Sequence, residues 1–259
     1  MVTESTSPVL TYAVLKSLRE SRFEPARAGE VPVTALYELR VPGERRPLGK
    51  VADLAGSPLA EPEATLRAGR YQEAGKQVEK VWESRRNNTI PSRGYLGLAM
   101  AMKALAQAGQ GEADGAICRW QAAQTLEPLL YGADLSAYGA AGKLLEDHPW
   151  GESVGPVKTV STKGESSEQV QRPEIVTRRQ PRFPGYAREY NSQGRVIMES
   201  VITAAGLPRN LALLTTDAVP GLEANALDAI CDWRFKPATY HGAPVPVHYS
   251  LTINFEVRE

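Results

Sequence analysis

The last third of the chain alternates strictly between apolar and polar positions. From Val245 to Val257 every odd-numbered residue is apolar, and the residues between them are mostly polar. A period of two places all the apolar side chains on one face of a strand. The pattern therefore predicts a long strand with one buried face, preceded by two shorter strands at 195–203 and 211–216.

A helical pattern lies between these strands. The apolar residues on its shared face are Leu222, Ala226, Ala229, Ile230 and Trp233. Pro237 is expected to end this helix, because proline lacks the backbone N–H that a helix needs. Trp233 and Phe235 are expected to be core residues that close the helix over the sheet. The order predicts an α+β domain at 173–259 with the topology β-β-α-β.

The middle of the chain, 63–150, is rich in alanine and has apolar residues at helical spacing, which predicts several antiparallel helices. Ala116, Trp120, Ala123 and Pro128 fall at the spacing of a tetratricopeptide repeat, and a partial second copy begins near Gly69. We expect an all-α, tetratricopeptide-like region. A plain helical bundle explains the pattern equally well.

Two turn-rich segments, 44–62 and 151–172, contain much Pro, Gly, Ser and charge, and we expect them to be linkers. The chain would then consist of an N-terminal piece at 1–43, the helical region and the C-terminal domain.

Composition excludes several classes of function. Lys+Arg and Asp+Glu both number 30, so no net charge draws the chain to nucleic acid or to an anionic membrane. His148, His241 and His248 have no ligand partners at metal-binding spacing, and no catalytic motif is present. We expect no enzyme activity, no metal and no cofactor.

The sequence gives few signs of location. The first ten residues lack the features of a secretory signal, and the most apolar stretch, Tyr95 to Ala108, is short and contains Lys103. No membrane span is expected in the chain as given. Cys118 and Cys231 fall within helical patterns of different segments, which favours two buried thiols over a disulfide. The cysteines leave the compartment open.

The C-terminal segment resembles the TonB C-terminal domain family. The resemblance rests on Pro181–Pro184, the strand 194–202 followed by Gly206, the stretch 222–238 that ends in WRFKPA, Gly242, Pro244–Val245, and the closing strand that ends at Phe255. The family implies a non-enzymatic protein-binding or energy-transduction module, which receives a segment of an outer-membrane transporter as an added β-strand.

The resemblance also implies a site and a location. We expect the partner-binding edge strand to include Val245, Val247, Tyr249, Leu251 and Ile253. The expected partners are outer-membrane transporters or other envelope proteins, in the periplasm or cell envelope. The chain lacks the membrane helix and proline-rich spacer of full transducers, so it would meet a membrane only through partners or through an anchor upstream of a truncated start.

An alternative function follows from the middle region. The chain could be a tetratricopeptide-like adaptor or scaffold, in which the TonB-like parts are structural or mediate homo-oligomers. The two hypotheses differ in where a partner peptide binds, on the C-terminal sheet or on the helices.

The N-terminal piece repeats part of the C-terminal domain. With a shift of 234 − 22 = 212 residues, RFEPA at 22–26 matches RFKPA at 234–238, so Phe23 and Pro25 correspond to Phe235 and Pro237. Only the helix and the final strand have counterparts, and such a half-domain cannot form a core alone. It could be completed by residues upstream, by a second chain or by the C-terminal sheet; of these, the sequence favours a truncated start.

Overall fold

The computed structural model describes residues 27–28, 31–32, 46–51, 54, 57–83, 91–157 and 170–256. The chain divides into two compact units, Met1–Glu44 and Arg45–Glu259. The described part of the first unit is an antiparallel pair, β1 (Arg27–Ala28) and β2 (Val31–Pro32). The rest of the predicted repeat, with Phe23 and Pro25, lies outside the described residues.

The second unit begins with a group of helices. They are α2 (Leu48–Val51), α3 (Ala60–Arg67), α4 (Tyr71–Glu83), α5 (Arg93–Gly109), α6 (Ala113–Leu126) and α7 (Gly139–Glu146), with the 3-10 turns η1 (Pro128–Gly132) and η2 (Ser136–Tyr138). The short strands β3 (Arg46–Pro47) and β4 (Ala133–Asp134) pair in parallel. The predicted helical middle is therefore present.

Apolar residues at helical spacing explain why these helices pack. Ala116, Trp120 and Ala123 on α6 are all buried, as are Leu48 and Leu59 within the expected linker 44–62. The helix α5 begins after Ser92, whose hydroxyl accepts a hydrogen bond from the backbone N–H of Tyr95 at 3.2 Å. The tetratricopeptide-like arrangement of these helices stays a prediction.

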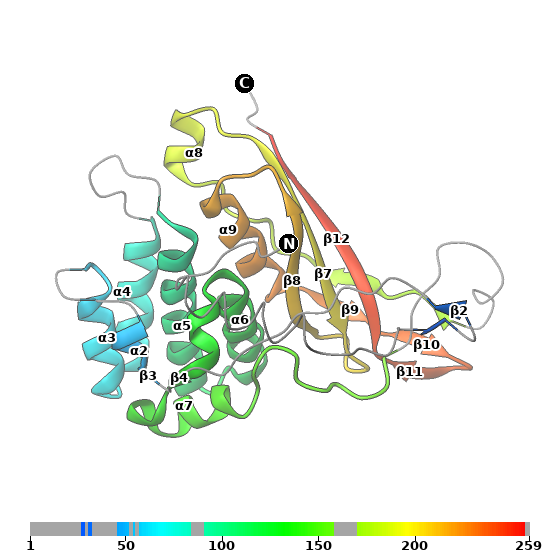
Figure 1. Cartoon of the computed structure of the whole chain (residues 1–259), viewed down its shortest axis with the longest axis horizontal. Helices are drawn as coiled ribbons and strands as arrows, with labels where there is room; N and C mark the ends of the chain where they lie inside the picture. The colour runs from blue at the N-terminus through cyan, green and yellow to red at the C-terminus, as the bar shows by residue number, and fades with distance from the viewer. Residues whose placement is uncertain are drawn as a thin grey trace. The chain divides into compact units, whose positions relative to one another are not determined.

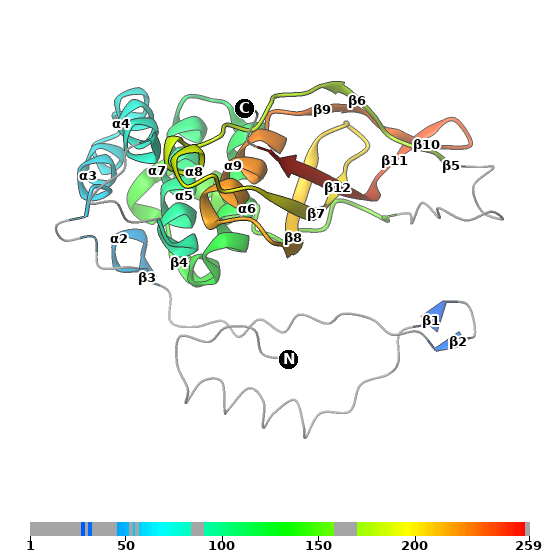
Figure 2. The same cartoon turned by 90° about the horizontal axis from the view of Figure 1, so that it is seen from above.

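The C-terminal part contains most of the strands. They are β5 (Val170–Gln171), β6 (Glu174–Thr177), β7 (Gly194–Ile202), β8 (Pro208–Thr216), β9 (Arg234–Lys236), β10 (Ala238–Tyr240), β11 (Ala243–Val245) and β12 (Val247–Phe255), with the helices α8 (Gly185–Glu189) and α9 (Pro220–Ile230). The three long strands form an antiparallel sheet in the order β12-β7-β8. Figure 2 shows β6 and β9 as a separate pair, beside the β10–β11 hairpin.

The end of the predicted helix needs correction. α9 ends at Ile230, so Pro237 does not end it, and Phe235 lies in the strand β9. Phe235 pairs with Ile175 of β6, and this strand pairing prevails over the helical pattern of the sequence. The predicted strand from Val245 is also interrupted at Pro246, which has no N–H to donate to a ladder.

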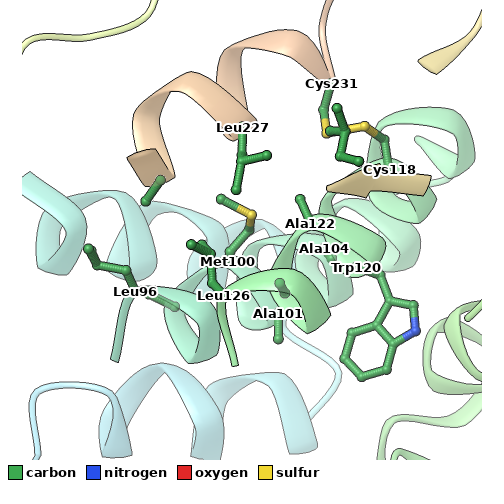
Figure 3. Close-up of a cluster of buried hydrophobic side chains, with 14 of the residues drawn as sticks. Leu96, Met100, Ala101, Ala104, Cys118, Trp120, Ala122, Leu126, Leu227 and Cys231 are labelled. Atoms are coloured by element: carbon green, nitrogen blue, oxygen red, sulfur yellow. A yellow bond between two sulfur atoms is a disulfide. The ribbon is translucent and has the colours of Figure 1, made fainter. Parts of the chain in front are cut away.

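The helix α9 lies between two layers. Figure 1 shows it between the sheet of β7, β8 and β12 and the group of helices, where it contacts β7 and β8 on one side and α5 and α6 on the other. All residues from Gly221 to Ile230 are buried. The helical region and the C-terminal domain thus share one core (Figure 3), in which Leu227 of α9 lies near Met100 of α5.

The two cysteines form a disulfide, so the prediction of free buried thiols was wrong. Cys118 lies on α6 and Cys231 follows α9 directly, with their Cα atoms 5.4 Å apart. Figure 3 shows the bond at the end of the apolar cluster. The sequence could not reveal this pairing, because it did not indicate that α6 and α9 would pack together.

Candidate protein-binding edge

The strand β12 forms one edge of the three-stranded sheet. It pairs with β7 along its full length, from Val247 opposite Ile202 to Phe255 opposite Gly194. On its other side the described residues contain no neighbouring strand. An unpaired edge offers a row of backbone N–H and C=O groups to another strand.

The register shows which residues offer these groups. The backbone N–H of Arg195 donates to the carboxylate of Asp217, and the C=O of Arg195 accepts from the N–H of Asp217 at 3.3 Å. Arg195 therefore directs its backbone away from β12. Because backbone directions alternate along a strand, the even-numbered residues of β7 bond to β12. The residues of β12 whose backbone groups point outward are then His248, Ser250, Thr252 and Asn254.

The side chains of β12 divide between two faces. Val247, Leu251 and Ile253 are buried, and Tyr249 is half-buried, whereas the even-numbered side chains are exposed. Of the expected edge residues, Val245 lies in β11 and the other four face the core. The groups available for contact belong to the even-numbered residues, which the apolar pattern did not single out.

Aromatic side chains hold β12 from the inner face. The rings of Phe235 and Tyr249 meet edge to face with centroids 5.8 Å apart, and Phe183 meets Phe255 in the same way at 6.0 Å. Trp233 and Phe235, which are both buried, lie side by side, and the indole N–H of Trp233 donates to the carbonyl oxygen of Arg179 at 2.8 Å. Pro237 is half-buried.

The opposite edge, β8, is covered at 210–211 by side chains of the helical region. The carbonyl oxygen of Leu211 accepts hydrogen bonds from the hydroxyl of Thr125 at 2.6 Å and from the indole N–H of Trp150 at 2.7 Å. The N–H of Asn210 donates to Oε1 of Gln121 at 2.9 Å. These backbone groups are used within the chain, so no other strand can bond to them.

Buried charges join α9 to the helical region. Arg119, which is 1% exposed, donates to Asp228 at 2.7 Å and to Asp232 at 2.8 Å, and Lys103 donates to Asp228 at 2.9 Å. Burial by itself raises the pKa of the Asp228 carboxyl, but Arg119 and Lys103 lower it more strongly, so that the pKa is about 2. Asp228 is ionised at neutral pH and balances two cations.

Two further polar side chains of α9 have partners in the helical region. The guanidinium of Arg93 donates two hydrogen bonds to Glu223, at 2.8 and 2.9 Å. The indole N–H of Trp82 donates to Asn225 at 3.1 Å. Glu223 and Asn225 are buried and therefore cannot bond to water. These contacts give their polar atoms the hydrogen-bond partners that they need.

The described residues offer little sign of other chemistry. Within the described ranges, no three or more His, Cys, Asp or Glu side chains are placed to hold a metal ion. An open groove of about 830 Å³ lies along α4 and α5, with Lys76, Lys80 and Gln107 among its lining residues. Among the described helices, none has both the length and the apolar character needed to cross a bilayer.

The C-terminal segment is similar in sequence to known proteins. Residues 179–257 match the family model of the Gram-negative bacterial TonB protein C-terminal. This segment is a TonB C-terminal domain. Protein TonB of Vibrio cholerae is 31% identical over 102 residues, which cover 38% of this chain and 42% of that relative. The chain thus spans less than half the length of this curated relative.

A solved structure is also similar. The solution NMR structure of the Pseudomonas aeruginosa TonB CTD covers 34% of this chain and 88% of its own, at 20% identity and a TM-score of 0.31. The match of the TonB C-terminal domain supports the expectation that the chain is not an enzyme.

Proposed function

We propose that the TonB C-terminal domain of this chain binds an extended segment of another envelope protein, such as an outer-membrane transporter, by adding it as a strand beside β12. The chain then serves as a non-enzymatic module of TonB-type energy transduction. Main-chain hydrogen bonds supply the affinity in this mode of binding, and side chains on the two faces supply the preference for particular segments.

The observation that carries the proposal is the contrast between the two edges of one sheet. β12 directs the backbone groups of His248, Ser250, Thr252 and Asn254 outward, with no neighbouring strand in the part of the chain that the structure describes. At β8 the N–H of Asn210 and the C=O of Leu211 are bonded to side chains of α6 and to Trp150.

The disulfide supports a location in the envelope. Disulfides persist in oxidising compartments such as the periplasm and are rare in the cytosol. The bond between Cys118 and Cys231, together with the relation to TonB proteins, favours the periplasm or cell envelope.

Chemical-shift mapping tests the proposal. A peptide derived from a TonB-dependent transporter should perturb the amides of 248–254. Thr252→Pro should abolish binding, because proline removes an outward N–H that the sheet itself does not use. Thr252→Val keeps this N–H and is the matched control, which should bind. Perturbations confined to 63–150 would contradict strand addition.

A second candidate function is a tetratricopeptide-like adaptor that holds peptides in the helical region. The groove along α4 and α5 favours it, since its lysine and glutamine side chains can bond to a polar peptide. Lys76→Ala combined with Lys80→Ala should then weaken binding, whereas Thr252→Pro should not.

The first unit supports the proposal of an internal repeat. With the shift of 212, the pairs Arg27–Pro32 and Ala28–Val31 fall on Thr239–Pro244 and Tyr240–Ala243, which are paired in the β10–β11 hairpin. We propose that 1–43 is a partial copy of the TonB C-terminal domain. Cross-strand NOEs between Arg27 and Pro32 are expected, and a helical pattern there would contradict the repeat.

A further inference from the structure

We infer that the helical residues 57–83 and 91–152 form a permanent internal cover over one edge of the sheet, so that β12 is the edge left open among the described residues. The cover occupies the β8 edge at 209–211 and packs on α9, so the chain takes one extended segment, at β12, and does not continue its sheet through this part of β8 into a second segment or a second copy of itself. The part of this inference that concerns β12 rests on the function proposed above.

The β8 strand is irregular at the place where the helical region covers it. The register between β7 and β8 shifts between Glu199 and Val201, and the hydroxyl of Ser200 donates to the carbonyl of Arg209 at 2.9 Å. In this irregular stretch the N–H of Asn210 and the C=O of Leu211 point away from β7, where an uncovered edge would be open to another strand. Both residues instead bond to side chains of the helical region.

The segment after α7 adds a second layer of contacts at the same place. The N–H of Gly151 donates to the side-chain oxygen of Asn210 at 2.8 Å, and the amide group of Asn210 donates to the carbonyl of Glu152 at 3.0 Å. The guanidinium of Arg209 bonds to Asp114 at the start of α6. Side chains and backbone of the cover thus occupy the position that an added strand would need.

The cover is also fixed to α9. Arg119 of α6 and Asp228 of α9 are buried and hydrogen-bonded to one another, so separating the two helices would break a buried ion pair. The disulfide from Cys118 to Cys231 ties the same two helices covalently. The cover therefore cannot exchange for an external partner while the disulfide is intact.

A peptide that copies β7, residues 194–202, is a suitable probe for the inference. In the folded chain β7 pairs with β12 on one side and with β8 on the other. Both of these contacts use the inner edges of β12 and β8, so the peptide serves as a strand-forming sequence that can bond through its backbone to whichever outer edge is open. Its choice between the edges reports which one is open.

The test uses the full oxidised chain. Amide hydrogen exchange of the free protein comes first: the N–H of Asn210 should exchange about a hundredfold more slowly than the outward N–H of Thr252, after correction for sequence. In the titration, the peptide should bind with one-to-one stoichiometry and perturb 248–254, but not 210–214. The Thr252→Pro chain should bind no peptide at either edge.

Two results would overturn the inference. One is exchange at Asn210 that is as fast as at Thr252; the other is peptide bound at 210–214, in the native chain or in Thr252→Pro. If Asn210 is protected but the peptide binds nowhere, strand addition at β12 fails as a function and the cover at β8 stands. The two ideas can thus fail separately.

Discussion

The two edges of the central sheet have the same kind of backbone and opposite availability. β12 and β8 both flank β7, and both are nine residues long. At β8 the outward groups of Asn210 and Leu211 are bonded to Gln121, Thr125 and Trp150, which lie 61 or more residues away along the sequence from their partners. The availability of a strand edge therefore depends on remote segments of the chain as well as on the strand itself.

The largest expected effect on stability lies at the contact between α9 and the helical region. Asp228→Ala removes the anion that Arg119 and Lys103 share, and it leaves the buried guanidinium with Asp232 alone and the half-buried ammonium with Glu79 alone. We expect the free energy of unfolding to fall by about 3–5 kcal/mol. Urea titration followed by circular dichroism measures the loss.

The matched control is an exposed ion pair. Asp147→Ala breaks the exposed pair with Lys143 on α7, which should be close to neutral because such pairs are well hydrated. Equal effects of the two substitutions would mean that the contact between α9 and its cover is no stronger than a surface contact.

The disulfide should contribute the next largest effect. The double substitution Cys118→Ala and Cys231→Ala opens a loop that spans 113 residues. We expect a loss of about 2–4 kcal/mol in the free energy of unfolding, mostly because the unfolded chain gains freedom. Differential scanning calorimetry should show one transition at a lower temperature. Two separate transitions would show that the bond alone unites the helical region with the C-terminal domain.

The free energy of unfolding should also depend on pH through Asp228. Its pKa is about 2 in the folded chain and 3.8 in the reference state, so the unfolded chain binds the proton more readily. The stabilisation is fully present above about pH 4 and is lost as the pH falls to about 2, a change of about 2 kcal/mol.

The native chain and Asp228→Ala should therefore differ less in stability at pH 2.5 than at pH 6 in urea titrations. A difference between the two chains that does not change with pH would show that Asp228 is not ionised between its cations.

The smallest expected effect tests the closed edge directly. Trp150→Phe removes one of the two donors to the carbonyl of Leu211 and should cost about 1 kcal/mol in the free energy of unfolding. Adding Thr125→Val leaves this buried carbonyl without a donor, so the double variant should lose more than the sum of the single ones. If the two losses simply add, neither donor replaces the other at this carbonyl, and covering the edge does not depend on keeping at least one of them.

The sequence pattern predicted the long strands of the sheet but not the short strands or how the helices pack around them. The alternation from Val247 to Phe255 determines β12, because one face must be apolar to join the core. The strands β9, β10 and β11 were missed, since three-residue strands have too few positions for a period to appear.

The site was harder to predict than the fold. Glu223 and Asp228 look like solvated residues on one face of a helix, and only the packing of α5 and α6 shows that they are buried and paired. The same packing brings Cys118 to Cys231. These are long-range contacts, and neither local periodicity nor composition contains information about them.

The register between β12 and β7 has a mechanical consequence. Nine residue pairs join these strands side by side, from Val247 to Phe255. A segment bound alongside β12 and pulled along its own axis would load its hydrogen bonds to β12, and then those from β12 to β7, in shear. Bonds loaded in shear share the force, whereas bonds peeled from one end break in succession. A strand joined lengthwise to this edge would therefore resist a steady pull even if it dissociated readily without tension.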